Sequence, residues 1–200
     1  MELLSSPTSP FARIVRVALI ELDMADRVTV TNINPMSPPD GFPDLNPLGK
    51  VPTLLLADGA ALYDSRTICD HLARHNPSRG LLPETGHRRD EVLTALSLAI
   101  GICDAAFSVV MERRRPEAQQ SAEWLSRWTS GILRGTQALD ASRGSASPKD
   151  LGQIGSAVAL AYLDFRLPDV DWRAGNEPLD TWQTGVRRWR SMRATEPLAA

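Results

Sequence analysis

Hydroxyl side chains gather just before the first amphipathic stretch of the chain. Thr8 and Ser9 lie in the turn formed by residues 6–10, and the apolar-periodic run 11–22 follows at once. Where a helix begins, exposed N–H groups and the macrodipole favour an anion, and a hydroxyl can donate a hydrogen bond to it. The turn could therefore hold a developing anion. The alternative is that Ser9 or Thr8 only caps the helix, with Pro10 at its first position.

Two later segments also combine residues that can do chemistry. The first is Asn46-Pro47-Leu48-Gly49-Lys50-Val51-Pro52-Thr53-Leu54, in which a cation precedes a Val-Pro pair at the start of an apolar run. The second is Leu62-Tyr63-Asp64-Ser65-Arg66-Thr67-Ile68, where an acid and a serine end a strand pattern and open a helical one. Taken singly, they fit a solvated lysine and a helix capped by Ser65.

Alternating short elements must position these segments. We expect strands at 1–4 and 27–33, a helix at 11–22, a proline-rich connection at 34–49, paired strands at 51–57 and 60–63 around Asp58-Gly59, and a helix at 65–74. The order is βαβ followed by ββα.

The remainder of the chain has helical patterns only. We expect a first domain at 1–78, a linker at 79–87 rich in breaking residues, and an all-helical domain at 88–200. The expected helices cover 88–115, 118–141, 151–166 and 179–192, with a loop at 143–148. Asp150 and Gln153 form a capping-box pattern for the third helix, which is apolar nearly all round and so belongs at the centre of its domain. Trp182 and Trp189 are seven residues apart and so share one face of the last expected helix, 179–192.

Taken together and in order, the three segments resemble those of cytosolic glutathione transferases, in particular bacterial members with a serine-type active-site turn. Omega-type transferases have Cys-Pro-Phe where this chain has Ser9-Pro10-Phe11. The second segment resembles the family's NPxGKVPxL signature, and the third its [DE]-S-x-x-I element. Looser matches in the helical part extend the resemblance over nearly the whole chain. It implies an α/β thioredoxin-like N-terminal domain, an all-α C-terminal domain and a homodimer.

The resemblance also implies a role for each residue. Ser9 would donate a hydrogen bond to the glutathione thiolate, and Val51, before a cis Pro52, would pair with the cysteinyl backbone. Lys50 would meet the glycyl carboxylate, while Ser65 and Asp64 would hold the γ-glutamyl carboxylate and amino group. Residues that could line a pocket for the electrophile are Phe11, Phe107 and Met111. Asp104 lies on the long helix of the dimer contact, and whether it reaches the neighbouring subunit's glutathione stays open.

The expected function is conjugation of the glutathione thiolate to a small hydrophobic electrophile, as part of detoxification. The alternative is a non-catalytic binding or regulatory protein of the same fold. Reduction of disulfides is disfavoured because Ser9 replaces the cysteine that it requires. The identity of the electrophile is not readable from the sequence.

Composition and charge limit the classes of binding partner that we expect for this chain. A net charge of −2 with dispersed basic residues gives no reason to expect nucleic acid, and Arg113-Arg114-Arg115 fits a solvated helix end. We find no targeting segment and expect no apolar stretch long enough to span a membrane, which favours a cytoplasmic location. Cys69 and Cys103 fit apolar positions. No metal is expected, because His71 and His75 lack a third ligand nearby.

Overall fold

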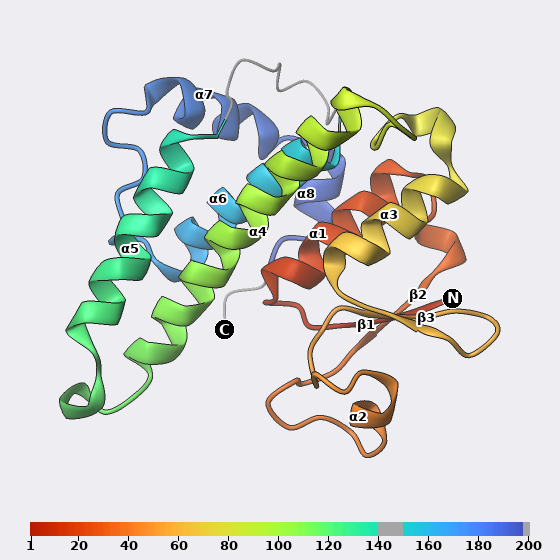
Figure 1. Ribbon diagram of the computed structural model, residues 1–200, viewed down its shortest axis with the longest axis horizontal. Coiled ribbons are helices and arrows are strands. Elements are labelled where there is room, and N and C mark those ends of the chain that lie inside the picture. The colour runs from red at the N-terminus through yellow and green to blue at the C-terminus, as the bar shows by residue number, and fades with distance from the viewer. Residues whose placement is uncertain (140–149, 198–200) are drawn as a thin grey trace.

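The computed structural model describes residues 1–139 and 150–197 of the 200-residue chain. Figure 1 shows a small sheet with short helices beside a group of longer helices. Helices α1 (Pro10–Glu21) and α3 (Ser65–His75) cover one face of the sheet, and the segment carrying α2 (Phe42–Leu45) lies on the other. This is the thioredoxin-like arrangement followed by a helical domain that the sequence predicts.

The sheet has the strand order β2-β1-β3-β4, formed by Glu2–Ser5 (β1), Thr29–Asn32 (β2), Thr53–Leu55 (β3) and Ala61–Leu62 (β4). β1 pairs parallel with β2, while β3 runs antiparallel to both β1 and β4. Gly59 adopts a φ of 87° in the β3–β4 turn, which suits a residue without a Cβ. The predicted βαβ-ββα order and the Asp58-Gly59 hairpin are confirmed.

The helical part comprises α4 (His87–Arg113), α5 (Ala122–Gln137), α6 (Leu151–Arg166), α7 (Glu177–Val186) and α8 (Arg190–Ala194). Short 3₁₀ turns cover Ala25–Arg27, Pro77–Arg79 and Glu117–Gln119. The predicted loop at 143–148 lies outside the described residues.

Helix α6 is the centre of the helical part, as predicted. Every residue from 151 to 160 is buried, and the helix packs closely on α4. A Cβ placed on Gly155 would lie 2.9 Å from Cδ1 of Leu96 and 3.0 Å from Cβ of Ala99, so glycine allows the two helices to approach. The carboxylate of Asp150 accepts the Gln153 N–H at 2.9 Å, and α6 begins at the predicted cap.

Several expectations about element ends were wrong. The predicted last helix is interrupted: α7 ends at Val186, and Trp189 has a non-helical backbone. A separate helix, α8, then begins at Arg190 and packs against α1. The rings of Trp182 and Trp189 still meet edge to face, with centroids 6.1 Å apart. Helix α5 begins at Ala122, where Ser121 caps it. Helix α3 is capped by Asp64, so Ser65 is its first residue.

The long helix α4 also differs from expectation. Of the described helices, it alone is long and apolar enough to cross a membrane, so the expectation that no apolar stretch approaches that length was wrong. Length and composition do not by themselves identify a span, because core helices satisfy the same criterion. Here α4 packs against both α5 and α6.

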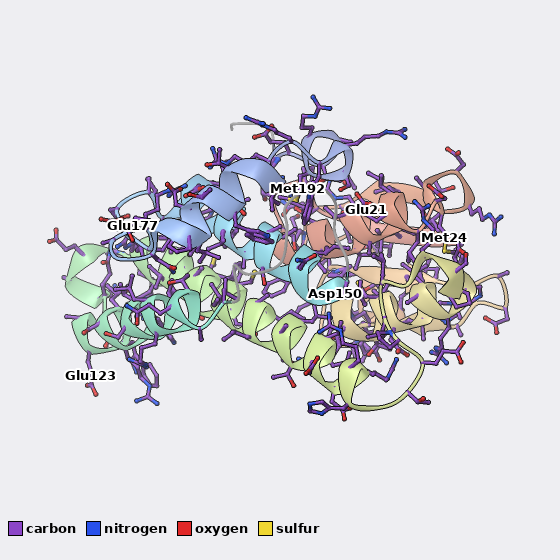
Figure 2. The ribbon with its side chains drawn as sticks, turned by 90° about the horizontal axis from the view of Figure 1, so that it is seen from above. Glu21, Met24, Glu123, Asp150, Glu177 and Met192 are labelled. Atoms are coloured by element: carbon purple, nitrogen blue, oxygen red, sulfur yellow. The ribbon has the colours of Figure 1, made fainter. Side chains whose placement is uncertain are left out.

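A buried arginine joins the first helix to the end of the chain. The guanidinium of Arg13, 5% exposed, donates to the carbonyl of Met192 at 3.0 Å and to Oγ1 of Thr195 at 3.4 Å. Figure 2 shows α8, with Met192 labelled, lying against α1. Burial lowers the pKa of Arg13 to about 10, which leaves the guanidinium charged at neutral pH.

Candidate active site

Ser9 stands at the junction of the β1–α1 turn and helix α1. It is the N-cap of the helix, and its Oγ accepts a hydrogen bond from the N–H of Ala12 at 3.2 Å, with Pro10 at the first helical position. Ser9 therefore caps α1, a role that can coexist with ligand binding. It uses the hydroxyl oxygen as an acceptor, so the O–H can still donate to a ligand. The same side chain lines a cavity of about 620 Å³.

That cavity lies between the two domains, and every site residue that the sequence predicts lines it. Its lining includes the predicted set Ser9, Phe11, Lys50, Val51, Pro52, Asp64, Ser65, Phe107 and Met111. They come from α1, the loop before β3, the β4–α3 junction and α4. A second cavity of about 470 Å³, between the first half of α4 and the start of α6, contains none of them.

The loop before β3 is fixed by a buried asparagine. The amide of Asn46, 1% exposed, donates to the carbonyl of Lys50 at 2.9 Å and to Oγ1 of Thr53 at 3.0 Å. The Val51–Pro52 peptide is cis, as predicted. Among the described residues, no backbone group pairs with the N–H or carbonyl of Val51. These two groups are thus available to an extended peptide ligand.

The start of α3 presents a carboxylate and a hydroxyl to the same cavity. Asp64 accepts the Arg66 N–H at 3.0 Å through Oδ1, and Ser65 is only 1% exposed. The exposed N–H groups of a helix start favour a bound carboxylate. The predicted acid–serine pair therefore faces Ser9 and Lys50 across one space.

The opposite wall comes from the helical domain. Ile100, Asp104, Phe107, Met111 and Arg114 line the cavity from α4, at spacings of four, seven, eleven and fourteen residues that define one helix face. Helix α6 adds Tyr162 and Arg166, four residues apart on its own face. Of these seven, the sequence indicated Phe107 and Met111 and left Asp104 open.

The charges of the cavity are distributed unevenly. Burial raises the pKa of Asp104; the charge of Lys50 opposes this rise and that of Asp64 adds to it. Burial also raises the pKa of Tyr162 to about 12, with Arg166 and Arg114 opposing the rise. The cavity lining thus includes two acids with a lysine, and a tyrosine with two arginines.

The two cysteines are remote from this chemistry. Both are fully buried and neither lines the cavity. Burial raises the pKa of Cys69 to about 12 and also raises that of Cys103, which keeps both as thiols. Among the described residues, no group of three or more His, Cys, Asp and Glu side chains could hold a metal ion.

The sequence matches one family model and has a relative that aligns over nearly its full length. Residues 8–75 match the family described as glutathione S-transferase, N-terminal domain. The uncharacterized GST-like protein YibF of Escherichia coli strain K12 is 32% identical over 203 aligned residues, which cover 98% of each chain.

Solved structures show the same likeness over the full length. A glutathione transferase family member from Pseudomonas fluorescens Pf-5 with bound glutathione is 36% identical, covers 99% of each chain and superposes with a TM-score of 0.92. A Methylobacillus flagellatus glutathione S-transferase with glutathione bound is 32% identical, covers 98% of this chain and 99% of its own, and has a TM-score of 0.90. The full-length identity, the shared fold and the arrangement around Ser9 place this chain in the glutathione S-transferase family.

Proposed function

We propose that the chain is a glutathione transferase in which Ser9 holds glutathione as a thiolate that attacks a small electrophile. The observation that carries the proposal is the convergence of Ser9, Lys50, Val51, Asp64 and Ser65 on one cavity. Each matches one chemical group of the tripeptide: the thiolate, the glycyl carboxylate, the cysteinyl backbone, the amino group and the γ-glutamyl carboxylate.

The energetics of thiol activation are within reach of these groups. A thiol of pKa near 8.5 must be lowered by about two units, which requires roughly 2.7 kcal/mol. A hydrogen bond to a charged group contributes about 1.5–3 kcal/mol, and a helix N-terminus adds about 0.3–1 kcal/mol. The hydroxyl of Ser9 at the start of α1 can therefore supply the stabilisation.

Known ligands of a relative support a site that accepts glutathione and a substituent on its sulfur. A second structure of the Pseudomonas fluorescens family member, also 36% identical with a TM-score of 0.88, has bound S-(propanoic acid)-glutathione. In our proposal such a substituent extends from the sulfur toward Phe11, Phe107 and Met111, which supply apolar contacts in this chain.

Two measurements test the proposal. Calorimetry should detect glutathione binding, and Ser65→Ala should weaken it about tenfold, since a hydrogen bond to the γ-glutamyl carboxylate is lost. Ser130→Ala, on the exposed face of α5, is the matched control. Conjugation of a chromogenic aryl halide should depend on Ser9. Glutathione binding without turnover would favour the non-catalytic binding protein, and absence of binding would contradict both functions.

The same proposal includes a homodimer and a role in detoxification, which follow from the family resemblance, and a cytoplasmic location, which we expect because the sequence shows no targeting segment. Light scattering during gel filtration measures the mass, for which the dimer requires twice 21.9 kDa. A monomer at micromolar concentration would contradict the first of these.

A further inference from the structure

Three consecutive arginines follow one another at the end of α4, and only the middle one lines the cavity. Arg113 donates two hydrogen bonds to the carboxylate of Asp169, at 2.9 and 2.7 Å, and Arg115 pairs with Glu112 at 3.2 Å. Arg114 instead contacts Sδ of Met111, another cavity residue, at 3.9 Å. The sequence predicts three solvated arginines at this helix end. In the structure Arg113 and Arg115 pair with carboxylates, whereas Arg114 lines the cavity.

A second arginine reaches the cavity from α6. The guanidinium of Arg166 lies over the ring of Phe165, 4.1 Å from its centroid. Nearby arginines are neutralised, since Arg173 and Arg187 both pair with Asp164. Within residues 1–139 and 150–197, neither Arg114 nor Arg166 pairs with a carboxylate.

A tyrosine lines the same cavity as the two arginines. Tyr162 lines the cavity one helical turn before Arg166, and its hydroxyl has no hydrogen-bond partner in the described part of the chain. Both arginines line the same cavity as this hydroxyl, and their charges act on it. With its pKa raised to about 12, the phenol keeps its proton at neutral pH and can donate a hydrogen bond to an anion there.

We propose that the electrophile carries a carboxylate, which Arg114, Arg166 and Tyr162 bind while the reactive carbon lies toward Ser9. Guanidinium groups match the two oxygens of a carboxylate, and Phe107 and Met111 give the body of the substrate an apolar wall. The inference rests on the proposed function and names its substrate class. In the reaction the thiolate sulfur bonds to the carbon; with an aryl chloride, the carbon–chlorine bond breaks and chloride leaves with the electron pair.

Binding of conjugates tests the inference without turnover. Calorimetry compares S-(ω-carboxyalkyl)glutathiones with S-alkylglutathiones of the same chain length, in a series of increasing length. When the alkyl chain is long enough for its carboxylate to reach Arg114 and Arg166, the carboxyalkyl conjugate should bind about tenfold more tightly than the alkyl conjugate of the same length. Arg114→Gln and Arg166→Gln should each remove most of that preference, whereas Arg115→Gln, which changes the same charge one residue away, should preserve it.

Turnover gives a second readout. The aryl chloride 4-chloro-3,5-dinitrobenzoate is compared with its neutral carboxamide, each kcat/KM being divided by the uncatalysed rate. The native protein should prefer the carboxylate, and Arg114→Gln should reverse or abolish the preference. Equal binding and turnover of charged and neutral partners overturns the inference and leaves the transferase intact. Failure to bind free glutathione, in contrast, overturns the proposed function and the inference with it.

Discussion

Replacing Ser9 by alanine and by glycine separates the two tasks of its hydroxyl. Alanine removes the oxygen that accepts the Ala12 N–H at 3.2 Å, and should lower the free energy of unfolding by about 1 kcal/mol. Glycine is itself an acceptable N-cap, and should cost only a few tenths of a kcal/mol. Urea denaturation with an unchanged slope measures this difference in stability.

Both substitutions remove the same donor to the thiolate. Losing a charge-assisted hydrogen bond of about 1.5–3 kcal/mol should raise the pKa of bound glutathione by about one to two units in either variant. From a native pKa of about 6.5, the thiolate fraction at neutral pH, and with it the conjugation rate, should then fall roughly three- to twenty-five-fold. Ultraviolet absorbance of the thiolate, titrated on the glutathione complex, gives the pKa directly, and Ser9→Thr should leave it close to that of the native protein.

The reasoning fails if the thiol pKa is unmoved in both variants while Ser9→Ala is destabilised. Ser9 would then be a cap and nothing more. The next donor to examine is Thr8, which also lines the cavity, and Thr8→Val would show whether it holds the thiolate instead.

Three further predictions concern stability. Asp150→Ala should lower the free energy of unfolding by at least about 1–2 kcal/mol, because α6 loses its cap and Arg88 loses a carboxylate partner. Asp150→Asn should recover only the capping part; urea denaturation measures both. Gly155→Ala should lower the free energy of unfolding by about 1–3 kcal/mol, because the new Cβ overpacks α6 against α4. Gly131 has no atom within 4 Å of the position that a Cβ would take, so Gly131→Ala should stabilise α5 by about 0.5–1 kcal/mol. Equal effects at the two sites would contradict the packing argument. Burial raises the pKa of Asp164, but arginine and tryptophan hydrogen bonds outweigh it and place the pKa below 3.8. Its contribution to stability should therefore be complete above that pH and be lost as the pH falls through the folded pKa, and Asp164→Asn should flatten the acid limb of a thermal-denaturation profile.

The part of the site that we propose to bind glutathione could be predicted because it consists of short local segments that resemble those of the family. A serine before a proline at a helix start, a Val-Pro pair at a strand start and an acid–serine pair each adopt their conformation within a few residues. The short fold connections between these turns then bring them to one edge of the sheet. The six residues predicted to bind glutathione consequently line the same cavity: Ser9, Lys50, Val51, Pro52, Asp64 and Ser65.

Beyond Phe107 and Met111, the wall from the helical domain could not be predicted, because it depends on how one domain packs against the other. The sequence shows that α4 and α6 are helices, but the face that Arg114, Tyr162 and Arg166 present is set by packing between elements far apart in the chain. Tyr162 fits a core position equally well, and it is in fact 5% exposed while lining the cavity. A triple-arginine run gives no sign of which member turns inward.

The contact of Arg13 has a consequence for synthesis of the chain. Its acceptors on Met192 and Thr195 follow it by 179 and 182 residues, so the first domain leaves the ribosome well before they exist. Until then the guanidinium must stay hydrated, because a buried charge without partners costs several kcal/mol. Helix α1 can therefore reach its final packing only after α8 has been translated. A nascent chain that stops short of Met192 should present an unfinished α1 to chaperones and proteases, which would couple the integrity of the Ser9 turn to completion of translation.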